Sequence, residues 1–356
     1  MKLRVGILGA TGAVGQKFIS LLHQHPWFEV SAVAASERSA GKLYRDAAHW
    51  LEETELPVHV AELTVQDASN SLLDCDFVFS GLDSSVAGEI EERYARAGYP
   101  VISNAKNFRM NAGVPLLIPE VNPDHLDLID AQDWGSDGYI VTNPNCASVG
   151  LTMVLKPLHD AFGIELVHVT TMQALSGAGY PGVPSLDAMA NVVPFISGEE
   201  DKVESEPLKI LGTLSAGHVQ PDIFAISATC TRVPVVDGHL ATVSVKLKRS
   251  ATPEAAIRAL ESFKSPELVA HLPGSPEKAL QYSDDASFPQ PRRHANAGRG
   301  MTVSVGRMRT CPILDLKFVC LAHNTIRGAA GGAILNAELL TSQGKIKHRS
   351  EVHALN

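Results

Sequence analysis

The first twenty residues constrain the fold more than any other part of the chain. Residues 3–8, LRVGIL, form an unbroken apolar run that predicts a buried strand, and they lead directly into the turn GATGAVG. A helix is expected from this turn to about Leu22. Glycines at positions 9, 12 and 15 allow a tight turn and a close approach of a pyrophosphate to the N–H donors of the helix start. This strand–turn–helix pattern predicts dinucleotide binding.

The residues that follow continue the alternation of strands and helices. Further apolar strands are expected at 28–36, 76–82 and 99–103, with a helix at 84–97. Strands that alternate with helices imply right-handed crossovers. The sequence therefore predicts a Rossmann-like, doubly wound and mainly parallel sheet in an α/β protein.

The pattern of apolar and polar residues changes after the strand-like segment GYIVTNP. The remaining strand-like runs are longer and alternate between apolar and polar residues, at 163–175, 224–236, 238–248, 301–309 and 313–322. Alternation of this kind predicts a mostly antiparallel sheet in an α+β domain. Residues 265–300, rich in Pro, Ser, Asp and Arg, are expected to form a long loop region.

Two domains are expected. The first spans residues 1–145 and is completed by a C-terminal helix within 325–356, whose small residues permit close packing. The second spans 146–324 and would carry catalysis and dimerisation.

Charge and composition exclude several classes of partner. The formal net charge is −9 and no block of like charge occurs, so nucleic acid is not an expected partner. No apolar run reaches the roughly 20 residues of a membrane span, and no membrane partner and a cytoplasmic location are expected. The five cysteines form no C-x-x-C pair and no His/Cys cluster occurs, so no metal site is expected.

The residues after the second strand indicate which dinucleotide binds. NAD-preferring folds usually place an acidic residue here, whereas this chain has Ser36, Arg38 and Ser39. Hydroxyls and a guanidinium suit a 2′-phosphate. NADP is therefore the expected cofactor, although Glu37 is a dissenting residue.

The segment PNCAS contains the chain's candidate nucleophile, Cys146. The cysteine opens a predicted helix, where N–H groups sharpen a thiol's reactivity and can hold an oxyanion. An isolated cysteine in such a place more often simply packs. Other candidate polar residues are Gln173 at the end of a long predicted strand and His239 at the start of a returning strand, with Arg232 seven residues before it. Glu206 and Lys209 lie one helical turn apart, and Arg109 lies in a loop after a strand of the first domain.

Together these motifs closely resemble the aspartate-semialdehyde dehydrogenase family, over nearly the whole chain. The resemblance is carried by GATGAVGQ, PNCAS, QALSGAGYPG, RVPVVDGH and NAGRGMTVSVGR, in this order and spacing. The archaeal and fungal branch is the most similar one, judged from LSGAGYPGVPSLD and GEEDKVESEPLKILG. Some members have CAT or CVA where this chain has CAS.

The resemblance implies a role for each catalytic residue. Cys146 would be the nucleophile, His239 the general acid/base, and Gln173 would orient the substrate and the covalent intermediate. Binding of substrate and phosphate is implied for Arg232 (carboxylate), Glu206 (ammonium), Lys209 and Arg109 (phosphate) and Asn145 (oxyanion environment).

The resemblance also implies the cofactor contacts and the overall activity. NADP would contact Gly9, Thr11, Gly12, Ala13, Val14, Gly15, Ser36, Arg38, Ser39, Ser80, Ser176, Gly177 and Asn324. The expected reaction is NADPH-dependent reductive dephosphorylation of L-4-aspartyl phosphate through a cysteine thioester, by a homodimer or homotetramer acting on small molecules.

Three alternatives remain open at this point. N-acetyl-glutamyl-phosphate reductase shares the reaction class, but its acylated nitrogen gives Glu206 no charge to meet, and that family tends to have Tyr-Pro after its cysteine. A malonyl-CoA reductase can be built on the same scaffold. A non-enzymatic NADP-binding protein is disfavoured by the intact set of Cys146, Gln173, Arg232 and His239.

Overall fold

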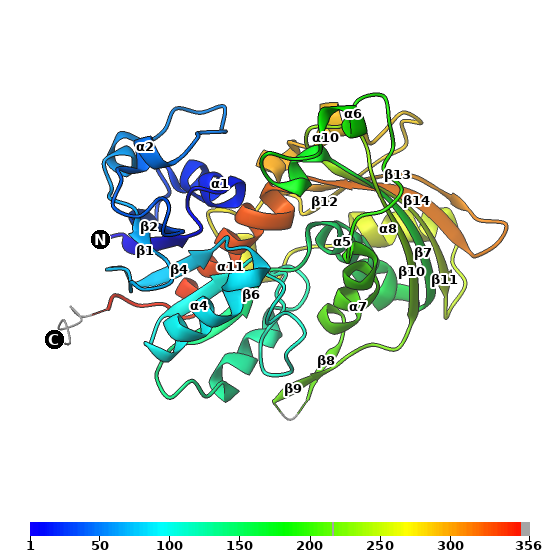
Figure 1. Ribbon diagram of the computed structural model, residues 1–356. Helices are drawn as coiled ribbons and strands as arrows, with labels where there is room; N and C mark the ends of the chain where they lie inside the picture. Colours follow the sequence, from blue (N-terminus) through cyan, green and yellow to red (C-terminus); the bar gives the residue numbers. More distant parts are fainter. Residues whose placement is uncertain (216, 350–356) are drawn as a thin grey trace. The chain divides into compact units, whose positions relative to one another are not determined.

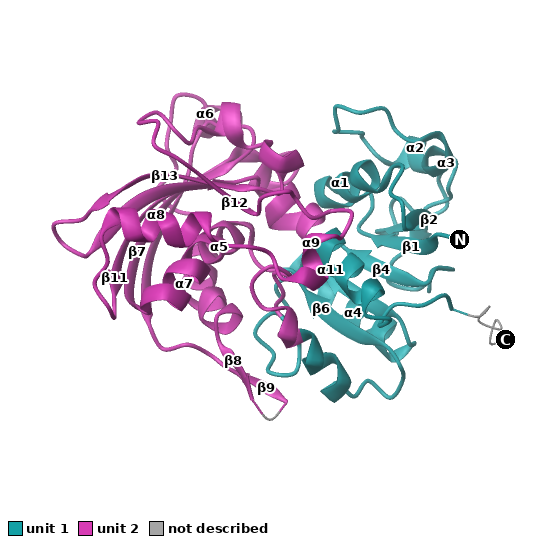
Figure 2. Ribbon diagram, turned by 180° about the vertical axis from the view of Figure 1, so that it is seen from behind, with its two compact units in different colours: residues 1–115, 126–143, 333–356 teal, residues 116–125, 144–332 magenta. Residues whose placement is uncertain are grey.

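The computed structural model of the protein describes residues 1–215 and 217–349, and the chain forms two compact units (Figures 1 and 2). Among the described residues, the first unit comprises Met1–Pro115, Leu126–Asn143 and residues 333–349, and the second comprises Leu116–His125 and the described part of Pro144–Gly332. Residues 116–125, 144–145 and 325–332, which were expected in the first domain, belong to the second unit. A buried ion pair between Glu120 and Arg327 (2.6 Å) joins the first and the last of these segments.

A six-stranded sheet forms the centre of the first unit, and all its neighbouring strands are parallel. The strand order is β3-β2-β1-β4-β5-β6. Its strands are β1 (Leu3–Leu8), β2 (Phe28–Ala35), β3 (Gln66–Asp67), β4 (Phe77–Ser80), β5 (Pro100–Ser103) and β6 (Tyr139–Thr142). β4, β5 and β6 are buried along their whole length, as continuous apolar runs in a parallel sheet are. The doubly wound parallel sheet predicted from the sequence is confirmed.

The helices of the first unit begin where the sequence offers suitable residues. They include α1 (Ala13–Leu22), α4 (Ser84–Arg96) and most of α11 (Gly331–Ser342). Asp83 caps α4 by accepting a hydrogen bond from the Ser85 N–H. The C-terminal helix starts later than expected, because Ile326–Ala330 form a π-helical turn before α11.

A second six-stranded sheet forms the centre of the second unit, in the order β10-β7-β11-β14-β13-β12. Its strands are β7 (Ile164–Gln173), β10 (Ala225–Arg232), β11 (His239–Leu247), β12 (Leu280–Ser283), β13 (Val303–Thr310) and β14 (Leu316–Ala322). The three central pairings are antiparallel and the two outer pairings are parallel. The mostly antiparallel sheet is therefore confirmed. β7 and β10 run parallel because a long connection through a helix separates them.

The loop expected at 265–300 is wrong in part, because the region contains short helices and a strand. This region contains β12, which extends the sheet beside β13. The strand has only four residues, of which Leu280 is buried, and it lies among Pro, Ser and Asp residues, so its pattern is too short to stand out.

Helices α5 (Cys146–Phe162), α7 (Glu199–Ile210) and α8 (Pro253–Glu261) pack on one face of the second sheet (Figure 1). The remaining short elements are α2 (Tyr44–Ala47), α3 (Val58–Ala61), α6 (Ser185–Ala188), β8 (Thr213–Ser215), β9 (His218–Gln220), α9 (Glu267–Ala270), α10 (Pro291–His294) and 3-10 turns at Pro123–Ala131, Leu175–Ala178 and Ala297–Gly300.

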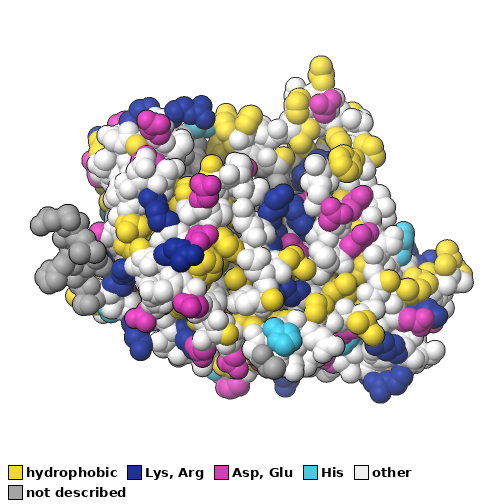
Figure 3. All heavy atoms as spheres, turned by 60° about the horizontal axis from the view of Figure 1, so that its bottom comes forward, with side chains coloured by type: hydrophobic (Ala, Val, Ile, Leu, Met, Phe, Trp, Pro, Cys, Tyr) yellow, Lys and Arg dark blue, Asp and Glu magenta, His cyan; other side chains and the backbone are white. Residues whose placement is uncertain are grey.

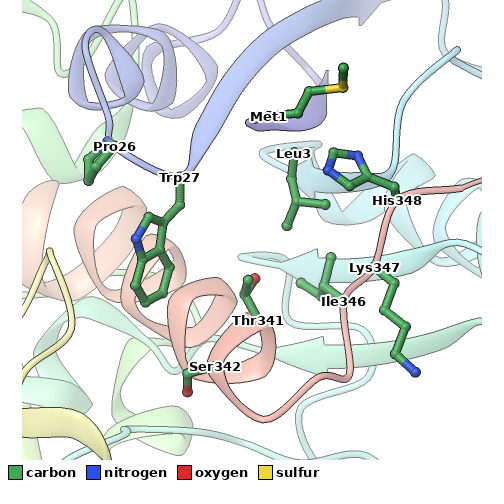
Figure 4. A pocket seen from close by; sticks show the side chains of 9 residues that line it. All are labelled: Met1, Leu3, Pro26, Trp27, Thr341, Ser342, Ile346, Lys347 and His348. Atoms are coloured by element: carbon green, nitrogen blue, oxygen red, sulfur yellow. The ribbon is translucent and has the colours of Figure 1, made fainter.

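Acidic and basic side chains are interspersed on the face drawn in Figure 3. An open hollow of about 540 Å³ in the first unit is lined by Trp27, Ile346, Lys347 and neighbouring residues (Figure 4), and none of the predicted site residues lines it. No helix in the described part of the chain is long and apolar enough to cross a membrane.

Candidate active site

Cys146 is the first residue of α5, as predicted. Asn145 caps this helix: its Oδ1 accepts hydrogen bonds from the N–H groups of Ala147 (2.9 Å) and Ser148 (3.2 Å). Cys146 is partly exposed, whereas the four other cysteines are buried. The helix start therefore presents one accessible thiol.

The register of three strands brings the other predicted residues together. Gln173 ends β7 and pairs with Arg232, which ends the parallel strand β10. His239 begins β11, which runs antiparallel to β7 with Leu240 opposite Met172. Because β11 begins where β7 and β10 end, the three polar side chains come from the same edge of the sheet.

The geometry joins Cys146 to His239. The distance from Sγ of Cys146 to Nε2 of His239 is 3.3 Å. The turn before His239 contains Gly238 with φ +97°, a backbone conformation that favours glycine. A nucleophile and its partner within hydrogen-bond reach are the geometric mark of covalent catalysis.

The other ring nitrogen of His239 accepts a hydrogen bond from the main chain. The backbone N–H of Ala174 lies 3.0 Å from Nδ1, and a backbone N–H can only donate. The neutral ring therefore carries its proton on Nε2, facing the sulfur. Burial, aided by the nearby Arg232 cation, lowers the pKa of His239 to about 3, so the ring is neutral at physiological pH.

Arg232 is hydrogen-bonded to the same residue, Ala174. Its Nη1 donates to the carbonyl oxygen of Ala174 over 2.8 Å, and only 8% of the residue is exposed. Burial lowers the pKa of the guanidinium, which nevertheless stays charged. Gly177 packs directly against it: a Cβ there would lie 2.8 Å from Nη1 of Arg232 and 3.1 Å from Cε1 of His239. This glycine leaves room for the arginine and the histidine.

Gln173 is held by a residue that the sequence analysis missed. Its Nε2 donates to Oε2 of Glu199 over 3.0 Å. The carboxylate of Glu199 also accepts from Asn145 and from Lys202. A sequence signal existed, because Glu199 and Lys202 repeat seven residues earlier the Glu-x-x-Lys spacing of Glu206 and Lys209.

Glu206 and Lys209 are both buried on α7, with 2% and 3% of each residue exposed. Oε2 of Glu206 accepts a hydrogen bond from the backbone N–H of Asn145 over 2.6 Å. Burial lowers the pKa of Lys209 to about 8, although the negative charge of Glu206 opposes this. Two carboxylates of α7, two helical turns apart, thus hold the residue that precedes the thiol.

Two residues predicted to contact the nicotinamide end of the cofactor contact each other. Nδ2 of Asn324 donates to the hydroxyl of Ser176 over 2.7 Å, and its Oδ1 accepts from the Gly238 N–H over 2.8 Å. Beyond Asn324, Gly328 lies against Cys146, since a Cβ there would lie 2.7 Å from Cα and Cβ of Cys146.

The glycine turn lies in the first unit, and each glycine meets a different constraint. Gly9 has φ +75°, and a Cβ there would lie 2.7 Å from the Gly81 oxygen. A Cβ at Gly15 would lie 2.4 Å from the Gly9 oxygen. At Gly12 a Cβ would meet only one atom, at 3.4 Å. The protein itself therefore needs glycine at 9 and 15, whereas at 12 the open space fits a bound pyrophosphate.

The other predicted cofactor residues differ in exposure. Thr11, Ala13 and Val14 lie in the turn and the first turn of α1, beside the three glycines. Ser36 and Arg38 are exposed in the turn that follows β2, and Ser39 is half-buried. These positions fit a group that carries a 2′-phosphate. Ser80 is fully buried, and its hydroxyl lies beside Glu91.

Arg109 is also in the first unit, in the chain after β5. It is 7% exposed, and its Nη2 donates to the carbonyl oxygen of Asn104 over 2.6 Å. The predicted site residues therefore fall into two sets. The glycine turn, Ser36, Arg38, Ser39, Ser80 and Arg109 lie in the first unit, and all the others lie in the second. Within the described residues, no group of three or more His, Cys, Asp and Glu side chains is placed to hold a metal ion.

Comparison with known proteins identifies the family. The descriptions "Semialdehyde dehydrogenase, NAD binding domain" and "Semialdehyde dehydrogenase, dimerisation domain" match residues 4–129 and 155–327. The aspartate-semialdehyde dehydrogenase of Archaeoglobus fulgidus is 49% identical over 345 residues, covering 96% of this chain and 99% of the relative. That of Aspergillus fumigatus is 47% identical over 358 residues, covering 97% and 99%.

A solved structure gives the same result. The structure of aspartate semialdehyde dehydrogenase with NADP from Candida albicans has a TM-score of 0.89 and 42% sequence identity, and the match covers 97% of this chain and 100% of that chain. The chain belongs to the aspartate-semialdehyde dehydrogenase family.

Proposed function

We propose that the protein reduces L-4-aspartyl phosphate to L-aspartate 4-semialdehyde with NADPH, and also catalyses the reverse reaction, in the biosynthesis of lysine, threonine and methionine. The observation that carries this proposal is the 3.3 Å contact between Cys146 Sγ and His239 Nε2 at the start of α5. Family membership supports the substrate.

The chain's own residues supply a covalent route. The Cys146 thiolate attacks the acyl carbon, phosphate leaves as the C–O bond breaks, and a thioester remains on the sulfur. After reduction the C–S bond breaks and the thiolate is restored. The Nε2–H of His239 donates a hydrogen bond to the sulfur and stabilises its negative charge both before attack and on departure.

NADP fits the glycine turn of the first unit. Gly12 leaves the space that a pyrophosphate needs, and Ser36 and Arg38 are exposed where a 2′-phosphate would lie. When bound, the cofactor supplies the hydride for the thioester carbon. Ser176, Gly177 and Asn324 are proposed to contact its nicotinamide end.

The substrate groups have matching partners. Arg232 would bind the α-carboxylate through its planar guanidinium, and Glu206 the ammonium group. Lys209 and Arg109 would bind the phosphate, and Gln173 would orient the acyl group. These roles are proposals that the burial and charge of each side chain support.

The experiment is phosphate-dependent reduction of NADP⁺ by L-aspartate semialdehyde, with N-acetyl-glutamate semialdehyde and malonate semialdehyde with coenzyme A as rival substrates. Activity on the first alone, lost without phosphate and in Cys146→Ala, is expected. Turnover by Cys146→Ala at the wild-type rate would reject the covalent route, and activity only on a rival would reject the substrate.

The two compact units are proposed to be the cofactor domain and the catalytic domain, the latter also making a homodimer that can associate further into a tetramer. The match to a dimerisation domain over 155–327 supports this. One face of the second sheet carries α5, α7 and α8, and a groove of about 420 Å³ lies between β7, β10 and the chain at 311–314. Leu166 and Ile313 are exposed there, at 38% and 88%.

We propose this groove as part of the dimer interface. Sedimentation of wild type and of Leu166→Glu tests the assignment. We expect wild type to sediment as a dimer and Leu166→Glu to sediment as a monomer. If Leu166→Glu sediments like wild type, the interface lies elsewhere. A cytoplasmic location is proposed from the biosynthetic role and would be tested by cell fractionation.

A further inference from the structure

Glu199 has no role in the chemistry described above, yet it accepts hydrogen bonds from three side chains around the nucleophile. Its carboxylate accepts from Nδ2 of Asn145 (3.0 and 3.1 Å), from Nε2 of Gln173 (3.0 Å) and from Nζ of Lys202 (2.6 Å). Only 8% of Glu199 is exposed. A buried carboxylate surrounded by three donors is a fixed element of the site.

The bonds to Glu199 decide which way two carboxamides face. A carboxamide has one accepting and one donating end. Because Nδ2 of Asn145 points to Glu199, its Oδ1 points to the N–H groups of Ala147 and Ser148 and caps the helix of Cys146. Because Nε2 of Gln173 points to Glu199, its Oε1 accepts from the Thr171 hydroxyl over 3.4 Å.

We propose that Glu199 is a positioning residue for this reaction, which orients Gln173 towards the substrate and Asn145 over the start of the Cys146 helix. The inference deepens the proposed function and rests on it for the identity of the substrate. Glu199 acts through the two amide side chains and does not itself touch the reacting atoms.

The charge of Glu199 matters in addition to its geometry. Burial opposes ionisation, but Lys202, Gln173 and Asn145 hold the pKa of Glu199 below its usual value, so the carboxylate is charged. Its field reaches both Arg232 and His239. A negative charge at this place disfavours a thiolate nearby, and its removal would favour one.

Glu199→Gln tests both aspects. The new amide offers one accepting oxygen to three donors and adds a donor of its own, so at least one of the hydrogen bonds from Asn145, Gln173 and Lys202 is lost. We expect kcat/KM for aspartate semialdehyde to fall on the order of 10²-fold, the cost of a misplaced catalytic group. Alkylation of Cys146 by iodoacetamide at pH 6 should become faster, because a negative charge has been removed. Mass spectrometry of the peptide containing Cys146 measures this rate separately from the four buried cysteines.

Glu199→Asp separates geometry from charge. It keeps the negative charge but withdraws the carboxylate by one methylene, so turnover should fall while alkylation at pH 6 stays at the wild-type rate. Asp201→Asn is the matched control, since it removes a charge from an exposed side chain in the same helical turn. Its kinetics and alkylation rate should equal those of wild type.

Three outcomes would overturn the proposal. They are wild-type turnover in Glu199→Gln, wild-type turnover in Glu199→Asp, or a loss of turnover in Glu199→Gln that accompanies slower alkylation and a lower thermal midpoint, as a merely structural residue would give. The alkylation assay needs no substrate. If wild type proved inactive on aspartate semialdehyde, faster alkylation in Glu199→Gln would still show that the charge of Glu199 acts on Cys146, while the proposed function would be rejected.

Discussion

The backbone N–H of Ala174 donates a hydrogen bond to Nδ1 of His239 over 3.0 Å, and this bond determines what the histidine can do. With Nδ1 occupied and the proton on Nε2, a second proton can bind only if the Ala174 bond breaks. The geometry therefore favours hydrogen-bond donation to the sulfur over full proton transfer. The general acid/base role expected for His239 would require this bond to open during the reaction.

A pH profile of Cys146 alkylation tests this conclusion. Because the pKa of His239 is lowered to about 3, the ring stays neutral from pH 5 upwards, and no inflection near pH 6.5 is expected. Iodoacetamide rates measured from pH 5 to 9 for wild type and His239→Gln provide the measurement. An inflection near pH 6.5 that disappears in His239→Gln would mean that the imidazole titrates and that the assignment is wrong.

The same lowered pKa predicts reduced stability in acid. Below about pH 6.5 the unfolded chain binds a proton at His239 that the folded chain does not bind until about pH 3. The free energy of unfolding should therefore fall as the pH decreases between these values. The fall should be smaller in His239→Gln, as measured by urea unfolding at pH 7 and pH 5, and an equal fall in both proteins would contradict the shift.

Gly12→Ala should weaken NADP binding without weakening the fold. A Cβ at position 12 meets only one atom, at 3.4 Å, but fills the space proposed for the pyrophosphate. The KM for NADP should rise at least tenfold, about 1.4 kcal/mol, with an unchanged thermal midpoint. Gly15→Ala is the contrasting variant, because its Cβ would lie 2.4 Å from the Gly9 oxygen and should destabilise the apoprotein. Equal thermal midpoints for Gly12→Ala and Gly15→Ala would contradict the different roles assigned to the two glycines.

Lys209 should make phosphate use depend on pH. Its pKa is lowered to about 8, so the side chain loses its positive charge as the pH rises through 8. The KM for phosphate in the oxidative direction should therefore rise between pH 7 and 9. Lys209→Arg, which remains charged throughout, should show a flatter profile, and the same slope in both proteins would remove Lys209 from the phosphate site.

Glu91→Gln should stabilise the protein at neutral pH and above. Burial raises the pKa of Glu91 from 4.5 to about 7, so the folded protein holds a proton that the unfolded chain releases between these values. Wild-type stability therefore decreases as the pH rises from 4.5 to 7, by roughly 3 to 4 kcal/mol at most, at about 1.4 kcal/mol per pKa unit. Urea unfolding at pH 5 and pH 8 measures this, with the exposed Glu89→Gln as control. A variant as pH-dependent as wild type would refute the shift.

The sequence predicted the parts of this structure that rest on long or distinctive patterns. The turn at Gly9–Gly15 and the alternation of strands and helices identified the parallel sheet, and long alternating runs identified the second sheet. β12 was missed because four residues are too few to show a period.

The sequence indicated the residues that we propose for the site, but not the contacts between them. Cys146 and His239 lie 3.3 Å apart, as a nucleophile and its partner should. Glu199 was missed because its proposed role depends on how the carboxamides of Gln173 and Asn145 are oriented, which the sequence does not show. The bond from Ala174 was missed because every residue except proline has a main-chain N–H, so the sequence does not indicate which one binds His239. The motifs that carry the family resemblance indicate neither the contacts of Glu199 nor the bond from Ala174 to His239.

The register between β7 and β10 also determines where the chain tolerates changes in length. Gln173 and Arg232 are paired across the two strands, and a single added residue within either strand would turn its side chains to the opposite face. The connection between the strands, residues 174–224, carries no such requirement along much of its length. Insertions and deletions compatible with activity should therefore accumulate in that connection, especially between Gly179 and Gly198, while both strands keep a constant length.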